Sequence, residues 1–287
     1  MKSNNPVFAR SEAFNGRGNA SPYPAYGQES SAPQYGDPSD YGTGVDERQA
    51  DQGNRMTIDS VVQKTAITLA VVIASAAVTW YWTGDAITES GATTDAVGKL
   101  YLALMVGSFG AFALSMVNSF KRVISPALVI AFAVLEGVAL GAFSKIIPIV
   151  ANVEHGIVLQ AVIGTFAAFA GTLAAYKFFD IKVTNKFRTF VVAAMFGMLA
   201  LGMMEMVLSF FGNQVGFFDF GTMGMLFAIG GLVLGVFMLI LDFDFVEQGI
   251  AAGLPERESW RAAFGLTVSL VWIYTNLLRL LAIFQSD

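Results

Sequence analysis

The chain has 287 residues, of which 55% are hydrophobic and only 14% are charged, and this composition excludes an ordinary soluble globular protein. With no cysteine and one histidine, the chain lacks the ligands for disulfides, thiolate metal sites and histidine-rich zinc sites. The net charge of −5 is accompanied by no basic patch, so the sequence does not indicate a nucleic acid partner.

Residues 1–55 differ in composition from the rest of the chain. They contain five of the eight prolines and are otherwise rich in Ser, Gly, Asn, Gln and Tyr, with no apolar periodicity. Such a segment cannot bury enough apolar surface to offset the entropy lost on ordering. We therefore expect a disordered tail, followed by a membrane domain over residues 56–287.

Seven apolar segments follow the tail, and each is long enough to cross a hydrocarbon core about 30 Å thick. They lack the two-residue alternation of barrel strands, so helices are the structure in which their backbone groups can be satisfied within lipid. The sequence thus predicts an all-α integral membrane protein with seven transmembrane helices. The predicted spans cover residues 65–83, 98–118, 125–149, 156–178, 187–211, 221–243 and 263–284.

The distribution of Lys and Arg between the two ends of these spans predicts the orientation in the membrane. Loops on the cytoplasmic side carry an excess of Lys and Arg. The other side has only Lys99 and Lys145, so we expect a cytoplasmic N-terminus and an outside C-terminus. The basic side carries Arg55, Lys64, Lys121, Arg122, Lys177, Lys182, Lys186, Arg188, Arg257 and Arg261.

Acidic residues cluster at the predicted cytoplasmic end of the sixth span. Asp242, Asp244 and Glu247 follow a run without any ionisable side chain. At about 100° per residue, Asp242 and Asp244 point to nearly opposite sides of a helix. Asp244 shares a face with Glu247, which favours Asp244 as the inward carboxylate. Asp242 is the alternative if the helix unwinds there.

Three further charges lie at membrane depth, namely Glu136 in the third span, Glu205 in the fifth and Arg279 in the seventh. A charge in the middle of a bilayer costs at least about 2.5–3.5 kcal/mol, so such residues face the bundle interior or water and pair with one another. They indicate a polar path through the bundle. The alternative is a structural ion pair between Arg279 and either Glu136 or Glu205.

The seventh span carries one polar stripe. Ser269, Asn276 and Arg279 are spaced by seven and three residues, so they lie along one face of a helix. This pattern predicts a helix in the centre of the bundle beside a polar path, or an Asn276 that only hydrogen-bonds a neighbouring helix. No nucleotide-binding loop, serine hydrolase motif or intramembrane aspartyl protease motif is present, so we expect no enzyme activity.

Four stretches resemble the bacterial branch of the Bax inhibitor-1 (transmembrane Bax inhibitor motif) family. They are Leu-Glu-Gly-Val-Ala-Leu-Gly-Ala-Phe-Ser at 135–144, Gly-Ile-Val-Leu-Gln-Ala-Val-Ile-Gly-Thr-Phe at 156–166, Leu-Asp-Phe-Asp-Phe at 241–245 and Leu-Val-Trp-Ile-Tyr-Thr-Asn-Leu-Leu-Arg-Leu-Leu at 270–281. The opening residues 1–8 are also similar to that branch. The resemblance covers the chain from about residue 55 to its end.

The resemblance implies a seven-helix fold with the last helix surrounded by the other six, and a calcium leak whose opening depends on pH. In that family, an aspartate at the end of the sixth helix shares a proton with an acid in the seventh and closes the path. Asp244 or Asp242 matches the first position, but Asn276 occupies the second and cannot titrate. Three outcomes remain open: the gate has lost pH control, Glu136 or Glu205 replaces the missing partner, or the protein does not conduct.

Three functions are compatible with these features. The first is a leak channel through which Ca²⁺ passes, with Asp244, Asp242 and Glu247 at a gate and Asp244, Glu136 and Glu205 as possible oxygen ligands for the ion. The second is a proton-coupled cation exchanger that uses the same acids as relays. The third is a non-conducting regulator that binds a membrane protein such as a protease. We expect the protein to lie in a bacterial plasma membrane. Its expected partners are membrane lipid, Ca²⁺ and H⁺, and we expect no cofactor.

Overall fold

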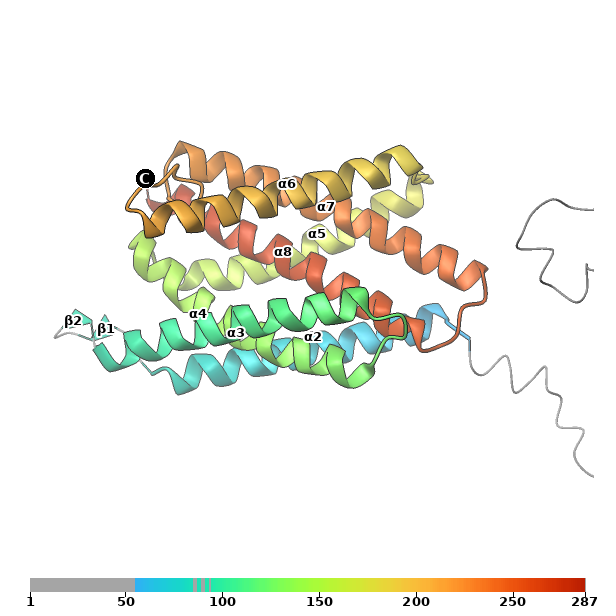
Figure 1. The fold of residues 1–287 in the computed structure, drawn as a ribbon, viewed down its shortest axis with the longest axis horizontal. Helices are drawn as coiled ribbons and strands as arrows, with labels where there is room; N and C mark the ends of the chain where they lie inside the picture. The colour runs from blue at the N-terminus through green and yellow to red at the C-terminus, as the bar shows by residue number, and fades with distance from the viewer. Residues whose placement is uncertain (1–54, 85–86, 89–90, 93, 287) are drawn as a thin grey trace, which may run out of the picture. The chain divides into compact units, whose positions relative to one another are not determined.

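The computed structural model describes residues 55–84, 87–88, 91–92 and 94–286, all within one compact unit, Asp46–Asp287. All but the last residue of the predicted disordered tail lies outside the described residues. The described part of the chain contains seven helices that are long and apolar enough to cross a membrane, which confirms the predicted fold class (Figure 1). They are α2 (Ile58–Trp82), α3 (Thr94–Phe120), α4 (Pro126–Ala151), α5 (Gly156–Phe178), α6 (Asn185–Phe210), α7 (Thr222–Ala251) and α8 (Glu258–Ser286).

Several helices are longer than the apolar segments that predicted them. The helix α7 continues to Ala251, eight residues past the predicted end at 243, and α8 begins at Glu258 rather than at 263. The apolar run marks the part of a helix that lies in hydrocarbon, whereas the backbone hydrogen bonds continue into the polar region. As a result, Asp242 and Asp244 lie within a regular helix, and α7 does not unwind at them.

The link between α2 and α3 contains a short antiparallel hairpin that the sequence did not predict. Its strands, β1 (Ile87–Thr88) and β2 (Gly91–Ala92), have two residues each. Strands of this length show no hydrophobic alternation from which they could be recognised.

At the end of the bundle where most Lys and Arg residues lie, the start of α2 contacts the loop between α7 and α8. The backbone amide of Met56 donates to the Leu254 carbonyl at 2.7 Å, and the Lys64 ammonium contacts a Glu256 carboxylate oxygen at 2.6 Å. Thr57 caps the first turn of α2 through its side chain. The start of α2 is therefore fixed against the loop between α7 and α8.

The last helix, α8, lies in the centre of the bundle. It packs against α2, α4, α5 and α7, and Figure 1 shows it running between the group of α2, α3 and α4 and the pair of α6 and α7. In its most apolar window, 67% of the residues are buried, against 11% in α6. The prediction of a central last helix is confirmed for the described residues.

The close pairing of α2 with α4 depends on two glycines. A methyl group at Gly137 would overlap the backbone carbonyl of Val72, and one at Gly141 would overlap that of Ala76. Small residues permit such close approach in membranes, where no hydrophobic force drives helices together. The two glycines therefore fix the distance between α2 and α4, which frames one side of α8.

The helices α3 and α6 each pack mainly against one neighbour, and the interface of α6 is the smaller of the two. Among the described residues, α3 forms its interface with α4, and α6 forms its interface with α7, but α3 and α6 do not form an interface with each other. Both expose many large apolar side chains, as expected for lipid-facing helices. Side chains of both helices line the cavity described next.

Candidate functional site in an acidic cavity beside the last helix

A cavity of about 690 Å³ lies between α3, α4, α6, α7 and α8. Of the described residues that line it, only Glu136 of α4 and Asp242 of α7 are ionisable. We call it the acidic cavity. Its wall on α8 includes Ser269, a member of the polar stripe in the sequence. The structure thus brings together two of the acids that the sequence singled out.

Glu136, Asp242 and Ser269 lie at a similar depth in the bundle. Each is about ten residues along its helix from the Lys- and Arg-rich end, which is about 15 Å at 1.5 Å per residue. The Ser269 hydroxyl donates a hydrogen bond of 2.5 Å to an Asp242 carboxylate oxygen. Glu136 has no hydrogen bond or ion pair with any described residue, and neither acid has a cationic partner there.

Hydroxyl groups of α3 extend the polar lining of the acidic cavity. Ser108, Ser115 and Ser119 line it, and Thr275 of α8 does so as well. These α3 residues were not predicted from the sequence to be part of a site. Their spacing of seven and four residues is the period of one helix face, so it is the signal that would have found them.

Asp244, the acid favoured from the sequence, points away from the acidic cavity toward α6. Its carboxylate accepts hydrogen bonds of 2.8 Å from the Arg188 guanidinium and from the Gln248 amide. Glu247 lies nearby on an exposed surface and accepts a bond of 2.6 Å from the Tyr176 hydroxyl. The structure therefore differs from the prediction, because Asp242 is the aspartate that faces α8 and Asp244 links α7 to α6.

Asn276 does not lie opposite the sixth-span aspartates. Its amide packs against Gly231 of α7 and donates to the Trp272 carbonyl of its own helix at 2.8 Å. Gly231 is about three helical turns from Asp242. In this structure, Asp242 packs against Gly265 of α8 and accepts a hydrogen bond from Ser269, so the polar stripe meets α7 at two separate levels.

Glu205 and Arg279 hold the loop between α6 and α7 and do not pair with each other. Both carboxylate oxygens of Glu205 accept backbone hydrogen bonds, from the amides of Val215 at 3.0 Å and Gly216 at 2.9 Å. Arg279 donates to the Phe217 carbonyl at 2.6 Å. The described residues contain no ion pair of Arg279 with Glu136 or Glu205, so the structural ion pair considered from the sequence is absent there.

We expect Glu205→Gln to loosen this loop. Glutamine has one carbonyl oxygen, so it can accept from only one of the two amides and turns its own NH₂ group toward the other. Leaving one partly buried amide unsatisfied costs about 1–3 kcal/mol. Hydrogen exchange at Val215 and Gly216 should become about fivefold to a hundredfold faster. Glu154→Gln, at an exposed acid without such bonds, should leave both rates unchanged; equal rates in Glu205→Gln would contradict the assignment.

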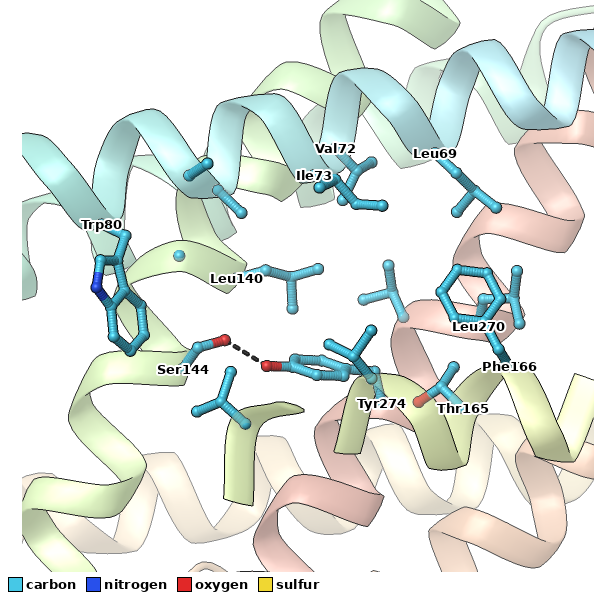
Figure 2. Close-up of a pocket in the computed structure, with 16 residues that line it drawn as sticks. Leu69, Val72, Ile73, Trp80, Leu140, Ser144, Thr165, Phe166, Leu270 and Tyr274 are labelled. Atoms are coloured by element: carbon cyan, nitrogen blue, oxygen red, sulfur yellow. Dashed lines mark hydrogen bonds between the residues drawn. The ribbon is translucent and has the colours of Figure 1, made fainter. Parts of the chain in front are cut away.

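A second cavity, of about 280 Å³, lies across α8 from the acidic cavity and is almost entirely apolar. Side chains of α2, α4, α5 and α8 line it (Figure 2). Its main polar feature is a hydrogen bond of 2.5 Å between the Ser144 and Tyr274 hydroxyls, which face one another in Figure 2. The two hydroxyls bond each other, and no ionisable acid or base lines this cavity among the described residues. It differs in this respect from the acidic cavity.

The described residues contain no group of three or more His, Cys, Asp or Glu side chains placed to hold a metal ion. Asp244, Glu136 and Glu205, named from the sequence as possible Ca²⁺ ligands, lie on different helices and have different surroundings. A permanent metal site is thus not built from them. The arrangement instead offers two separate carboxyl groups and several hydroxyls in one cavity.

The fold and the cavity define a multi-pass membrane protein in which a central helix separates an acidic cavity from an apolar one. A family model described as Bax inhibitor 1 like matches residues 5–286, almost the whole chain. The chain therefore belongs to the Bax inhibitor 1 like family, as its resemblance to the Bax inhibitor-1 motifs predicted. A search of curated proteins found no match.

Proposed function

We propose that this protein is a cation leak through which Ca²⁺ passes by way of the acidic cavity. The observation that carries the proposal is the pair of carboxyl groups, Glu136 and Asp242, that line one cavity inside the bundle without a Lys or Arg among its described lining residues. Ca²⁺ takes several oxygen ligands from carboxylates, hydroxyls and water. An acidic cavity at membrane depth provides such oxygens where a cation would otherwise meet hydrocarbon.

The composition of the cavity suits passage better than storage. Conduction requires an ion to bind well enough to enter and weakly enough to leave. Two carboxyl groups and scattered hydroxyls meet this requirement, whereas a closed cage of four or more acidic ligands would hold Ca²⁺ tightly. The absence of a three-acid cluster among the described residues agrees with a leak.

Contacts between α7 and α8 support a closed state of this path. Ser269 donates to Asp242, and the Trp272 indole donates to the Gly231 carbonyl at 2.8 Å. Asn276 packs on the same glycine. These contacts fix α8 on α7 along one wall of the cavity, so we propose that opening requires α8 to separate from α7 at Ser269. Asp242 is then the acid of the gate, and it is held by a hydroxyl group in place of a second carboxyl group.

Calcium entry into liposomes tests the proposal. Purified protein is reconstituted around a trapped Ca²⁺ dye, without a gradient of any counter-ion, and entry is followed between pH 6 and 8. Because protons and Ca²⁺ compete for the same carboxyl oxygens, entry should become faster as the pH rises. Glu136→Gln should slow it about tenfold or more, since it removes a charge that faces the ion.

Glu154→Gln is the matched control and should conduct like the unchanged protein, because Glu154 lies on an exposed loop outside the cavity. Entry that appears only with an opposing proton or cation gradient would favour the exchanger. No entry above that of empty liposomes at any pH would reject the leak and favour the regulator that binds a membrane protein.

The proposed orientation places the Lys- and Arg-rich end of the bundle in the cytoplasm of a bacterial cell, with the protein in the plasma membrane. Asp242 and Glu136 are then about 15 Å from the cytoplasmic end of their helices. Cysteine labelling with an impermeant reagent in intact cells tests this, because the chain has no native cysteine. A cysteine added at residue 154 should react from outside, and one at residue 182 should not.

A further inference from the structure

The acidic cavity is lined partly by side chains that are exposed on the surface of the bundle. Its outer rim is formed by apolar side chains of α3 and α6, which both line the cavity and are exposed on the lipid-facing surface. No interface between α3 and α6 closes this rim in the described part of the chain. The cavity can therefore be reached from the bilayer without passing along the bundle axis.

Aromatic rings form part of the lining of the acidic cavity. Six of them border the cavity, and they come from four of its five helices. The faces of aromatic rings attract cations, and organic cations in particular bind among such rings. The six are Phe112, Phe120, Phe132, Phe196, Phe264 and Trp272.

We propose that the acidic cavity is a binding site for a lipophilic organic cation that enters from the bilayer between α3 and α6. The apolar rim would admit the hydrophobic body of the molecule, the rings would surround it, and its positive charge would lie between Glu136 and Asp242. The volume of about 690 Å³ falls within the range of about 300–1,000 Å³ found for small-molecule sites. A hydrated inorganic ion needs neither the apolar rim nor the rings, so this inference goes beyond the Ca²⁺ leak and does not rest on it.

Charge complementarity decides which class of ligand the cavity takes. The described lining contains two carboxyl groups and no basic side chain, so an anion of the same shape would meet only repulsion. A neutral molecule would leave both carboxyl groups without a positive counter-charge at membrane depth, which is costly. A cation with an apolar body satisfies the acids and the apolar lining together.

Tetraphenylphosphonium is the probe, and tetraphenylborate is its control, because the two ions have nearly the same shape and opposite charge. Binding of each to the full-length protein in lipid nanodiscs is measured by equilibrium dialysis, with empty nanodiscs subtracted to remove partition into lipid. We expect saturable binding of about one phosphonium ion per chain and no saturable binding of the borate. Saturable binding of both ions, or of neither, would overturn the proposal without the use of any variant.

Variants then locate the bound charge. Glu136→Gln and Asp242→Asn together should weaken phosphonium binding at least tenfold, since both ionic contacts are lost. Glu247→Gln, at an exposed acid of α7 outside the cavity, should not change it. Unchanged binding in a correctly folded double variant, judged by size-exclusion chromatography, would place the ion elsewhere and overturn the proposal.

A pair of exposed phenylalanines on α6 tests lateral entry and the role of the rings. Phe196 lines the cavity, whereas Phe190 lies on the same helix but does not. Phe196→Leu should weaken binding about twofold to fivefold through loss of the ring, and Phe190→Leu should leave it unchanged. Equal effects of the two changes would contradict entry at this rim.

The two assays separate this inference from the proposed leak. Phosphonium binding without Ca²⁺ entry would retain the site and reject the leak. Ca²⁺ entry without saturable phosphonium binding would retain the leak and reject the site. If both hold, bound phosphonium should slow Ca²⁺ entry in the same liposomes, because the two cations use the same carboxyl groups.

Discussion

Gly137→Leu should destabilise the protein more than any other single change considered. A side chain at this position begins with a Cβ atom that overlaps the backbone carbonyl of Val72 and the side chain of Ser75. A backbone atom cannot turn aside as a flexible side chain does, so α2 must move away from α4. We expect a loss of about 3 kcal/mol or more in the free energy of unfolding. Steric trapping or detergent unfolding in bicelles measures it.

Gly171→Leu provides the matched control for this change. Gly171 is also a glycine within a membrane-spanning helix, α5, but no atom outside its own helix lies within 4 Å of a Cβ placed there. The added leucine would face lipid, so stability should change by less than about 0.5 kcal/mol. Similar losses in the two variants would show that glycine removal acts through helix propensity and not through the contact between α2 and α4.

The second large effect is expected from a double-mutant cycle at Glu136 and Asp242. If one Ca²⁺ uses both carboxyl groups in passing, either single neutralisation removes most of the conductance. The double variant should then be little worse than the poorer single variant, so the two effects are strongly non-additive. Initial rates of Ca²⁺ entry for the unchanged protein, Glu136→Gln, Asp242→Asn and the double variant give the coupling directly.

Additive effects in this cycle would mean that the two acids act on separate steps. Asp244→Asn serves as a comparison, because Asp244 pairs with Arg188 of α6 rather than facing the acidic cavity. We expect Asp244→Asn mainly to weaken the attachment of α6 to α7, which would be measured as a lower free energy of unfolding. A loss of Ca²⁺ entry in a stable Asp244→Asn protein that matched the loss in Asp242→Asn would contradict the placement of the path.

The helical fold was predictable because its signal is strong and local. Seven apolar runs, separated by short polar links, identify seven spans whatever their arrangement in space. The central place of α8 was also predictable, since its polar stripe would be unfavourable against lipid. The predicted ends of the helices were less accurate, because an apolar run marks only the part of a helix that lies in hydrocarbon. The helix α7 extends two turns beyond its apolar part.

The site was only partly predictable, since it depends on which face of each helix meets a neighbour. Glu136 and Asp242 were named, yet Asp244 was preferred because it shares a face with Glu247. A better guide was present in α7, where Gly231, Gly235 and Asp242 lie on one stripe at spacings of four and seven. Both glycines contact α8, so the stripe continues to Asp242. In α7, the glycines that pack against α8 therefore indicate which face of the helix points inward better than the neighbouring charged residues do.

Long-range partners were the least predictable part. Glu205 and Arg279 carry opposite charges at membrane depth, which suggested that they pair with each other or with Glu136. The structure instead uses both to bind backbone groups of the loop between α6 and α7. Backbone amides and carbonyls leave no trace in residue identity, so no pattern of side chains could reveal these contacts.

If the acidic cavity is reached between α3 and α6, the lipid bilayer becomes part of the proposed site. Because α3 and α6 do not pack closely against each other in the described residues, we expect the distance between them to depend on the lateral pressure and thickness of the surrounding membrane. Short-chain and long-chain lipids should therefore give the same chain different cavity widths. Detergent, which exerts no lateral pressure, removes this constraint, so rates and affinities measured in micelles describe a different physical system from those measured in a membrane.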